Sequence, residues 1–285
     1  MRAAVYGRFC VLRVLNRKMK NGAASLQKRR RFLSGIHCEA CRVSRQVWRD
    51  TIENTIKAAD GRVTVFCGCV NTSTERTIED IKEAEQLGAK YVVATAPFYI
   101  QYACQDELLR HYEKIAASTK LNVVIYNIPG MVHCSIAPET IAKLADIENI
   151  VAVKDSSADW EQVQRLLFML EGKDISFFNG AEELCGPAME FGADGCVPGL
   201  GVFFPELFVN MYEAAKAGDT EKVYQLQKQC WAVRKSLSVG KHWLSAMKHI
   251  GYHLGLCDDV VSFPIEPLSE SEKTEIDRIV DTVMH

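Results

Sequence analysis

The chain has 285 residues, of which 48% are hydrophobic and 25% charged, and its formal net charge is −2. This composition indicates a globular protein that is long enough for one α/β barrel or for two ordinary domains. The sequence contains no apolar run of about 18 residues, so it predicts no membrane span.

Charge is distributed unevenly along the chain. Residues 1–34 hold ten of the 34 Lys and Arg residues and no acidic residue, because the first acid is Glu39. The remainder therefore carries 24 basic and 36 acidic residues, a net charge of −12. We do not expect this acidic body to bind nucleic acid.

Residues 1–34 admit two interpretations. Their Arg-rich, acid-free composition is typical of a mitochondrial transit segment. They show no clear helical apolar face, which a transit segment would have. They could equally be an altered start of the first domain in a cytoplasmic protein. The 11 cysteines lack regular spacing, which favours a reducing compartment over a disulfide framework.

From Ser44 onward, strand and helix patterns alternate. The apolar periodicity and the capping residues predict helices over about 44–59, 74–87, 105–118, 138–146, 159–170 and 183–191. Short apolar runs predict strands over 63–67, 90–96, 123–126, 150–154, 175–178 and 195–197. Beyond Pro205 only helical patterns remain, at about 206–216, 219–237, 241–254 and 269–283.

This alternation implies parallel strands that are joined by right-handed crossovers. Six strands follow Ser44, so one or two more must come from residues 1–34. We therefore predict an α/β fold, a (β/α)8 TIM barrel with an atypical or incomplete first strand and extra C-terminal helices. The expected parts are a basic leader or altered first unit (1–34), the barrel body (35–215) and a C-terminal helical extension (216–285).

A buried strand, 150–153, ends in Lys154. Burying a lysine in this position costs free energy unless the amine has an ion-pair partner or takes part in catalysis. Desolvation favours the neutral amine, which is the form that attacks a ketone to form a Schiff base. A strand-end lysine that reaches solvent and pairs with Asp155 is equally consistent with this stretch alone. The C-terminal strand ends carry the chemistry in such barrels.

Cysteine and histidine residues could also form a metal site. Cys38 and Cys41 lie beside His37, and Cys67 and Cys69 follow on a later strand. No second Cys-x-x-Cys or His pair completes a zinc spacing, so we predict no metal.

Several motifs at the strand ends resemble the pyruvate-dependent class I aldolases, a family that includes dihydrodipicolinate synthase and N-acetylneuraminate lyase. The resemblance covers roughly residues 39–285. The matching pieces include Pro97-Phe98-Tyr99, Tyr126-Asn127-Ile128-Pro129, Val153-Lys154-Asp155-Ser156-Ser157 and Asn179-Gly180. The second and third of these, one βα unit apart, form a highly specific pair.

The resemblance implies that Lys154 forms the Schiff base with pyruvate and that Tyr126 shuttles protons. Tyr99 matches a tyrosine that the family contributes across a subunit interface, which implies a homotetramer built from dimers. No metal or organic cofactor is implied, since the lysine imine acts as the electron sink. Backbone amides at Ile36 and His37, where the family carries two hydroxyl residues, would hold the pyruvate carboxylate.

The substrate is less well determined, although Gly180 and Val197 are expected to line its site. Met131 stands where dihydrodipicolinate synthases usually carry an arginine for the distal carboxylate of their aldehyde substrate. Glu182 and Glu183 match an acidic pair that binds sugar hydroxyls in N-acetylneuraminate lyases. We therefore expect a 2-keto-3-deoxy sugar acid or an N-acetylneuraminate-like substrate. The alternatives are condensation of pyruvate with aspartate semialdehyde, or a catalytically impaired paralogue that serves as a binding or assembly module.

Overall fold

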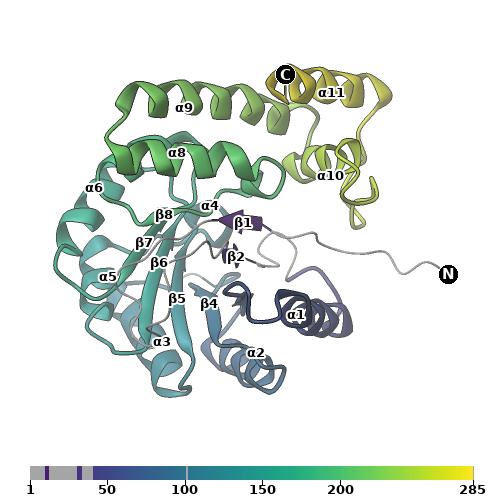
Figure 1. Ribbon diagram of the computed structural model, residues 1–285. Coiled ribbons are helices and arrows are strands. Elements are labelled where there is room, and N and C mark those ends of the chain that lie inside the picture. Colours follow the sequence, from purple (N-terminus) through teal and green to yellow (C-terminus); the bar gives the residue numbers. More distant parts are fainter. Residues whose placement is uncertain (1–9, 13–30, 34–40, 101, 285) are drawn as a thin grey trace.

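The computed structural model describes residues 10–12, 31–33, 41–100 and 102–284 (Figure 1). Its centre is a parallel sheet in which six strands are hydrogen-bonded in chain order. The strands are β3 (Phe66–Gly68), β4 (Tyr91–Thr95), β5 (Asn122–Asn127), β6 (Ile150–Asp155), β7 (Ser176–Asn179) and β8 (Gly195–Cys196).

Helices connect the strands and cover the sheet (Figure 1). They are α1 (Arg45–Ala59), α2 (Thr74–Gln86), α3 (Gln105–Ala117), α4 (Pro129–Val132), α5 (Pro138–Leu144), α6 (Trp160–Met169), η1 (Glu182–Leu184) and α7 (Cys185–Glu190). The predicted alternation and the TIM-barrel-like architecture are confirmed.

Two capping residues account for the start of α1 and α2. The side chain of Ser44 accepts a hydrogen bond from the backbone N–H of Val47, and Ser73 does the same for Arg76. Each hydroxyl satisfies an N–H group that the first helical turn leaves without a partner.

The predicted first strand after Ser44 is shorter than expected. We predicted residues 63–67, whereas β3 begins at Phe66. The register explains the difference, because Phe66 lies opposite Tyr91, the first residue of β4. Residues 63–65 therefore have no β4 residue to pair with.

The strands expected from residues 1–34 are only partly as predicted. β1 (Cys10–Leu12) and β2 (Arg31–Leu33) pair with each other in antiparallel fashion, outside the parallel sheet. Within the described residues, the parallel sheet therefore ends at β3 and β8. A parallel pairing needs a long crossover, usually a helix packed on the sheet, and residues 1–34 lack a helical apolar face. The proposed boundary at residues 34 and 35 lies outside the described residues.

The chain after β8 contains the expected helices (Figure 1). After η2 (Gly199–Val202) come α8 (Pro205–Ala217), α9 (Thr220–Arg234), η3 (Lys235–Ser238), α10 (Trp243–His253) and α11 (Glu270–Met284). No helix in the described part of the chain is long and apolar enough to cross a membrane.

The two faces of the sheet bury two separate clusters. On β6, Ala152 belongs to the cluster that includes Phe178 and residues of α8 to α11, whereas Val153 belongs to the cluster beneath the crossover helices. We call the face of Ala152 the inner face and the face of Val153 the outer face. Successive residues of a strand alternate between them.

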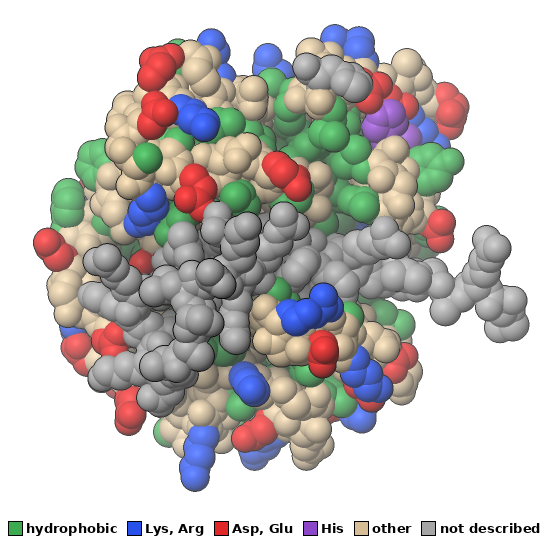
Figure 2. All heavy atoms as spheres, in the orientation of Figure 1, with side chains coloured by type: hydrophobic (Ala, Val, Ile, Leu, Met, Phe, Trp, Pro, Cys, Tyr) green, Lys and Arg blue, Asp and Glu red, His purple; other side chains and the backbone are tan. Residues whose placement is uncertain are grey.

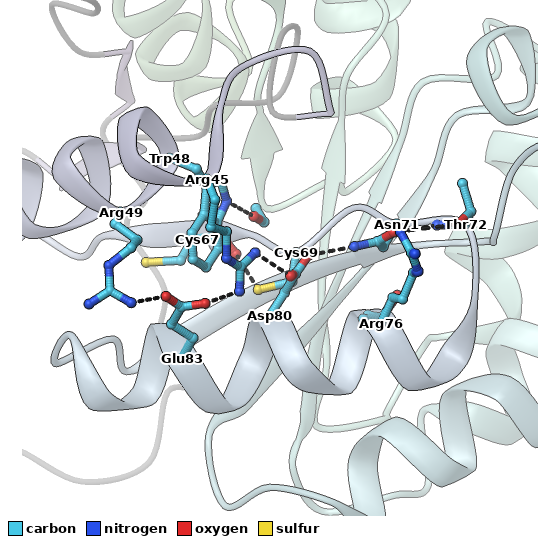
Figure 3. A network of polar contacts seen from close by, with 12 residues as sticks. Arg45, Trp48, Arg49, Cys67, Cys69, Asn71, Thr72, Arg76, Asp80 and Glu83 are labelled. Atoms are coloured by element: carbon cyan, nitrogen blue, oxygen red, sulfur yellow. Dashed lines mark hydrogen bonds and ion pairs between the residues drawn. The ribbon is translucent and has the colours of Figure 1, made fainter.

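A network of ion pairs and hydrogen bonds connects α1 to α2 on the outer side of β3 (Figure 3). Arg45 pairs with Asp80 and Glu83, and Arg49 also pairs with Glu83. The indole Nε1 of Trp48 donates to the carbonyl of Gly68 at 3.1 Å. These contacts hold α1 against the carboxyl end of β3. Elsewhere on the face drawn in Figure 2, the charged side chains of both signs are interspersed.

Candidate active site

Lys154 lies on the inner face near the carboxyl end of β6. Its register partners are Tyr126 on β5 and Phe178 on β7. The lysine is only 7% exposed, and its Nζ lies 4.1 Å from the centroid of the Tyr126 ring. The two predicted catalytic residues of neighbouring strands are therefore in direct contact.

Asp155 does not pair with this lysine, because it follows on the outer face. Its carboxylate accepts hydrogen bonds from Asn127 Nδ2 at 2.7 Å, from Gln162 Nε2 at 2.9 Å, and from the N–H and hydroxyl of Ser157 at 3.0 and 2.5 Å. No other carboxylate of a described residue forms an ion pair with Lys154 either. The alternative of a solvent-reaching lysine paired with Asp155 is therefore wrong.

Gly180 lies against the lysine side chain. Its N–H donates to the carbonyl of Asp155 at 2.6 Å. A Cβ at this position would lie 2.8 Å from Cε of Lys154 and would overlap the hydroxyl of Ser156. Glycine therefore leaves the space that the lysine stem occupies.

Tyr99 occupies a different environment from Tyr126. It is 91% exposed, and its φ of +85° lies in the left-handed region that disfavours residues other than glycine. Such a backbone costs about 1–3 kcal/mol, and residues held in it tend to cluster at functional sites. The single chain does not bury Tyr99.

The two predicted sugar-binding acids make contacts within the chain. Glu182 Oε1 accepts from the backbone N–H of Leu200 at 3.0 Å. Glu183 forms an ion pair with Arg234 of α9. Val197 is buried after β8, and its N–H donates to the backbone carbonyl of Asn179 at 2.7 Å.

Three further positions were expected to bear on substrate binding. Ile36 and His37 lie outside the described residues. Met131 lies exposed on α4, so this position offers an apolar side chain and no charge.

Sequence reasoning missed Thr95, which precedes Tyr126 in the same row of register partners. Its hydroxyl is buried and has no hydrogen-bond partner among the described residues. A polar residue at the last position of a buried strand was the available signal.

Among the described residues, no group of three His, Cys, Asp or Glu side chains is arranged to hold a metal. Cys67 and Cys69 are buried on and after β3, while Cys41 is exposed. Burial raises the pKa of the Cys67 thiol to about 12, which disfavours the thiolate that binds zinc. His37 and Cys38 lie outside the described part of the chain.

Comparisons with known proteins agree with this architecture. The model of the dihydrodipicolinate synthetase family matches residues 32–283. A 4-hydroxy-tetrahydrodipicolinate synthase from Kosmotoga olearia is 33% identical over 239 residues, which is 83% of this chain and 80% of that protein. One from Geobacter metallireducens is 29% identical over 231 residues, 81% of this chain and 79% of that protein.

Solved structures show the same likeness. The dihydrodipicolinate synthase of Bacteroides thetaiotaomicron matches with a TM-score of 0.79 and 30% identity, covering 84% of this chain and 82% of that one. That of Bacillus anthracis matches with a TM-score of 0.80 and 27% identity, covering 88% and 85%. The chain therefore belongs to the dihydrodipicolinate synthetase family, whose members are class I aldolases and lyases that act through a Schiff base with pyruvate.

Proposed function

We propose that Lys154 of this chain forms the imine with pyruvate and that Tyr126 moves the protons. The observation that carries this proposal is the contact between the two side chains. The lysine is buried at a strand end, has no carboxylate partner among the described residues, and lies against the tyrosine ring. A buried amine with these surroundings is suited to nucleophilic attack.

The reaction begins when the neutral Lys154 amine attacks the C2 carbonyl of pyruvate. The carbonyl oxygen becomes the hydroxyl of a carbinolamine and, once protonated, leaves as water, which gives the imine. Loss of a proton from C3 then produces an enamine, whose C3 bonds to an aldehyde carbon. Hydrolysis of the resulting imine releases the product and the free lysine. No metal or organic cofactor enters these steps, because the imine itself accepts the electron pair.

Tyr126 is the proposed group for the proton transfers. Dehydration, enamine formation and carbon–carbon bond formation or cleavage each move a proton close to the imine. A phenol can relay these protons without placing a fixed charge beside the lysine amine. Its ring already contacts Nζ, so it needs no large rearrangement to act.

We further propose that Tyr99 acts across an interface in a homotetramer made of two dimers. The exposure and the left-handed backbone of Tyr99 support this role, because a large aromatic side chain is held in solvent at a cost in backbone energy. The proposed location is the cytoplasm, with mitochondria as the alternative if residues 1–34 act as a transit segment.

For the second substrate we propose aspartate semialdehyde, which would make the reaction a condensation. The names of the relatives support this choice: the synthases of Kosmotoga olearia and Geobacter metallireducens are both 4-hydroxy-tetrahydrodipicolinate synthases. The internal contacts of Glu182 and Glu183 weaken the case for a sugar acid, since both carboxylates already have partners.

A 2-keto-3-deoxy sugar acid is the second candidate. Met131 favours it, because it places no cation where a distal carboxylate of the aldehyde would need one. Activity assays with both substrates separate the candidates. Faster condensation of pyruvate with aspartate semialdehyde supports the first, and faster cleavage of a keto-deoxy sugar acid supports the second.

Borohydride trapping tests the shared first step. Incubation with pyruvate and sodium borohydride should add a reduced pyruvyl group to Lys154, seen by mass spectrometry of the peptide. Lys154→Ala should abolish the adduct, while Lys173→Ala, a partly buried lysine of a surface ion pair, should leave it unchanged. No adduct on the folded native chain would refute the proposal and favour the impaired paralogue that acts as a binding or assembly module.

A further inference from the structure

Three residues form a row on the inner face at the carboxyl ends of β4, β5 and β6. Thr95 is the register partner of Tyr126, and Tyr126 is that of Lys154. Side chains of register partners in a parallel sheet point to the same face. Val93, two residues before Thr95, belongs to the inner cluster together with Tyr126. Thr95 therefore shares the face that carries the proposed lysine nucleophile.

The hydroxyl of Thr95 is left without a partner. The residue is 2% exposed, and its Oγ1 forms no hydrogen bond with any described residue. A buried hydroxyl that has lost its water and gained no protein partner is energetically unfavourable. Unpaired polar groups of this kind are uncommon in folded proteins and call for a specific cause, such as a role toward a ligand or an ordered water.

The backbone of Thr95, in contrast, is firmly held. His111 Nε2 lies 3.1 Å from the carbonyl oxygen of Thr95, and His111 Nδ1 lies 2.9 Å from Thr74 Oγ1. A carbonyl can only accept, so Nε2 carries the proton. Burial lowers the pKa of His111 to about 4, so the ring is neutral near pH 7 and Nδ1 accepts from the Thr74 hydroxyl. Tyr102 lies 3.3 Å from Thr74 Oγ1 and donates to it in turn.

This chain of hydrogen bonds fixes the strand end and leaves the side chain of Thr95 available. The carbonyl of Thr95 accepts from the buried Nε2 of His111, while its hydroxyl has no partner among the residues that the structure describes. The only other unpaired buried side-chain atom among the described residues is Asn179 Oδ1, and Asn179 follows Phe178 on the opposite face from Lys154. Among the described residues of the row, Thr95 therefore carries the buried hydroxyl that has no hydrogen-bond partner.

We propose that the Thr95 hydroxyl hydrogen-bonds an oxygen of the keto acid bound at Lys154 and so helps to select and hold pyruvate. This inference rests on the proposed imine chemistry of Lys154. The partner is an α-keto acid, since its carboxylate and keto oxygens can accept from a hydroxyl. Thr95 then supplies a side-chain hydroxyl to a site whose expected carboxylate-binding positions, Ile36 and His37, have none.

The dimensions of the row allow this contact. Neighbouring strands lie about 4.8 Å apart. Lys154 Nζ is held against the ring of Tyr126, which lies between Lys154 and Thr95 in the row. A three-carbon unit bonded to Nζ extends about 4 Å from it by ordinary bond lengths. A keto acid bonded to Nζ can therefore extend along the Tyr126 ring toward Thr95, whose strand lies one spacing beyond that of Tyr126.

Two substitutions at this position test the proposal. Thr95→Val replaces the hydroxyl with a methyl group of the same shape, and Thr95→Ser keeps the hydroxyl. The pyruvate concentration that gives half-maximal borohydride trapping should rise about 10- to 100-fold in the valine variant, as expected for the loss of one hydrogen bond to a charged group. The serine variant should stay close to the wild type.

Thermal stability distinguishes binding of pyruvate by Thr95 from a purely structural role of this residue. Because the hydroxyl has no hydrogen-bond partner in the described part of the chain, Thr95→Val should leave the Tm unchanged or raise it while pyruvate binding weakens. Thr77→Val is the matched control: Thr77 is equally buried, but its hydroxyl donates to the carbonyl of Ser73 at 2.9 Å. It should lower the Tm and leave the half-saturating pyruvate concentration unchanged.

The role of Thr95 would be refuted if Thr95→Val needed the same pyruvate concentration as the wild type for half-maximal trapping. It would also be refuted if both Thr95 variants had a lower Tm and trapped pyruvate more weakly. Failure of the imine proposal looks different, because the wild-type chain itself would then form no adduct with pyruvate.

Discussion

Gly180 packs directly against Lys154, so closely that a Cβ at position 180 would lie 2.8 Å from Cε of the lysine. Real Cβ atoms do not approach another carbon so closely, and this Cβ would also overlap the hydroxyl of Ser156. Gly180→Ala should therefore displace the lysine stem from its place beside Tyr126. We expect a loss of about 1–3 kcal/mol in unfolding free energy, typical of overpacking, and slower borohydride trapping of pyruvate.

Gly186→Ala is the matched control for this prediction. A Cβ there would lie 2.9 Å from Cγ1 of Val223, in contact with α9 and away from the lysine. This variant should lose stability to a similar extent and should trap pyruvate at the wild-type rate per folded molecule. If both alanine variants trapped pyruvate equally well, Gly180 would have no special relation to the lysine.

Asp155 supports the strand end from the outer face, although it does not pair with Lys154. Its carboxylate accepts four hydrogen bonds and is completely buried. Asp155→Asn would turn one acceptor oxygen into an N–H donor that faces other donors. We expect a loss of about 2–4 kcal/mol in the free energy of unfolding measured in urea. Asp159→Asn, at the exposed N-cap of α6, should cost less than about 1 kcal/mol. Equal losses at the two positions would contradict the assigned contacts.

The contact between Lys154 and Tyr126 could be predicted from the sequence. Each residue ends a buried strand, and the two strands are separated by one helical crossover, so parallel pairing brings their ends together. The same logic applied one unit earlier leads to Thr95, but nothing local marks its hydroxyl as unpaired. That property depends on every neighbouring group at once and is visible only in three dimensions.

The roles expected of Glu182 and Glu183 show a second limit. Their spacing after β7 matches a substrate-binding pair, yet Glu183 meets Arg234, which lies 51 positions later on α9. Such long-range ion pairs leave no periodic signal in the sequence. The antiparallel pairing of β1 with β2 was missed for a similar reason, since a three-residue strand is too short to show a pattern.

His111 should make the stability of the protein depend on pH. Burial lowers the pKa of His111 from its ordinary value of 6.5 to about 4, so the unfolded chain takes up a proton at a higher pH than the native chain. Its contribution to stability is therefore complete above about pH 6.5 and is lost as the pH falls to about 4. The full loss is on the order of 3 kcal/mol.

Urea unfolding at pH 7 and at pH 4.5 measures this contribution when the wild type is compared with His111→Gln. Glutamine cannot take up a proton in this range, so the difference between the two pH values should be smaller in the variant. The Asp and Glu carboxylates titrate in both proteins, so their effects on the free energy of unfolding cancel in the comparison. The same pH dependence in both proteins would show that His111 takes up its proton equally in the folded and unfolded chains.

His249 joins α10 to α11 and to the loop between them. Its Nδ1 lies 3.0 Å from Asp259 and its Nε2 lies 3.0 Å from Asp277, and the side chain is only 4% exposed. His249→Phe keeps a ring of similar size but removes both contacts to the carboxylates. We expect a loss of about 2–4 kcal/mol in unfolding free energy, because Asp259, the less exposed of the two carboxylates, is left facing a buried apolar ring.

His253 provides the comparison that tests this account of the helical extension. It also contacts two carboxylates, Asp277 at 2.9 Å and Asp281 at 2.8 Å, but its side chain is 25% exposed. Water can replace these contacts, so His253→Phe should cost no more than about 1 kcal/mol. Limited proteolysis should correspondingly cleave the segment between α10 and α11 sooner in His249→Phe than in His253→Phe. Equal stability and equal cleavage rates would mean that burial of the His249 contacts adds nothing to the docking of α11.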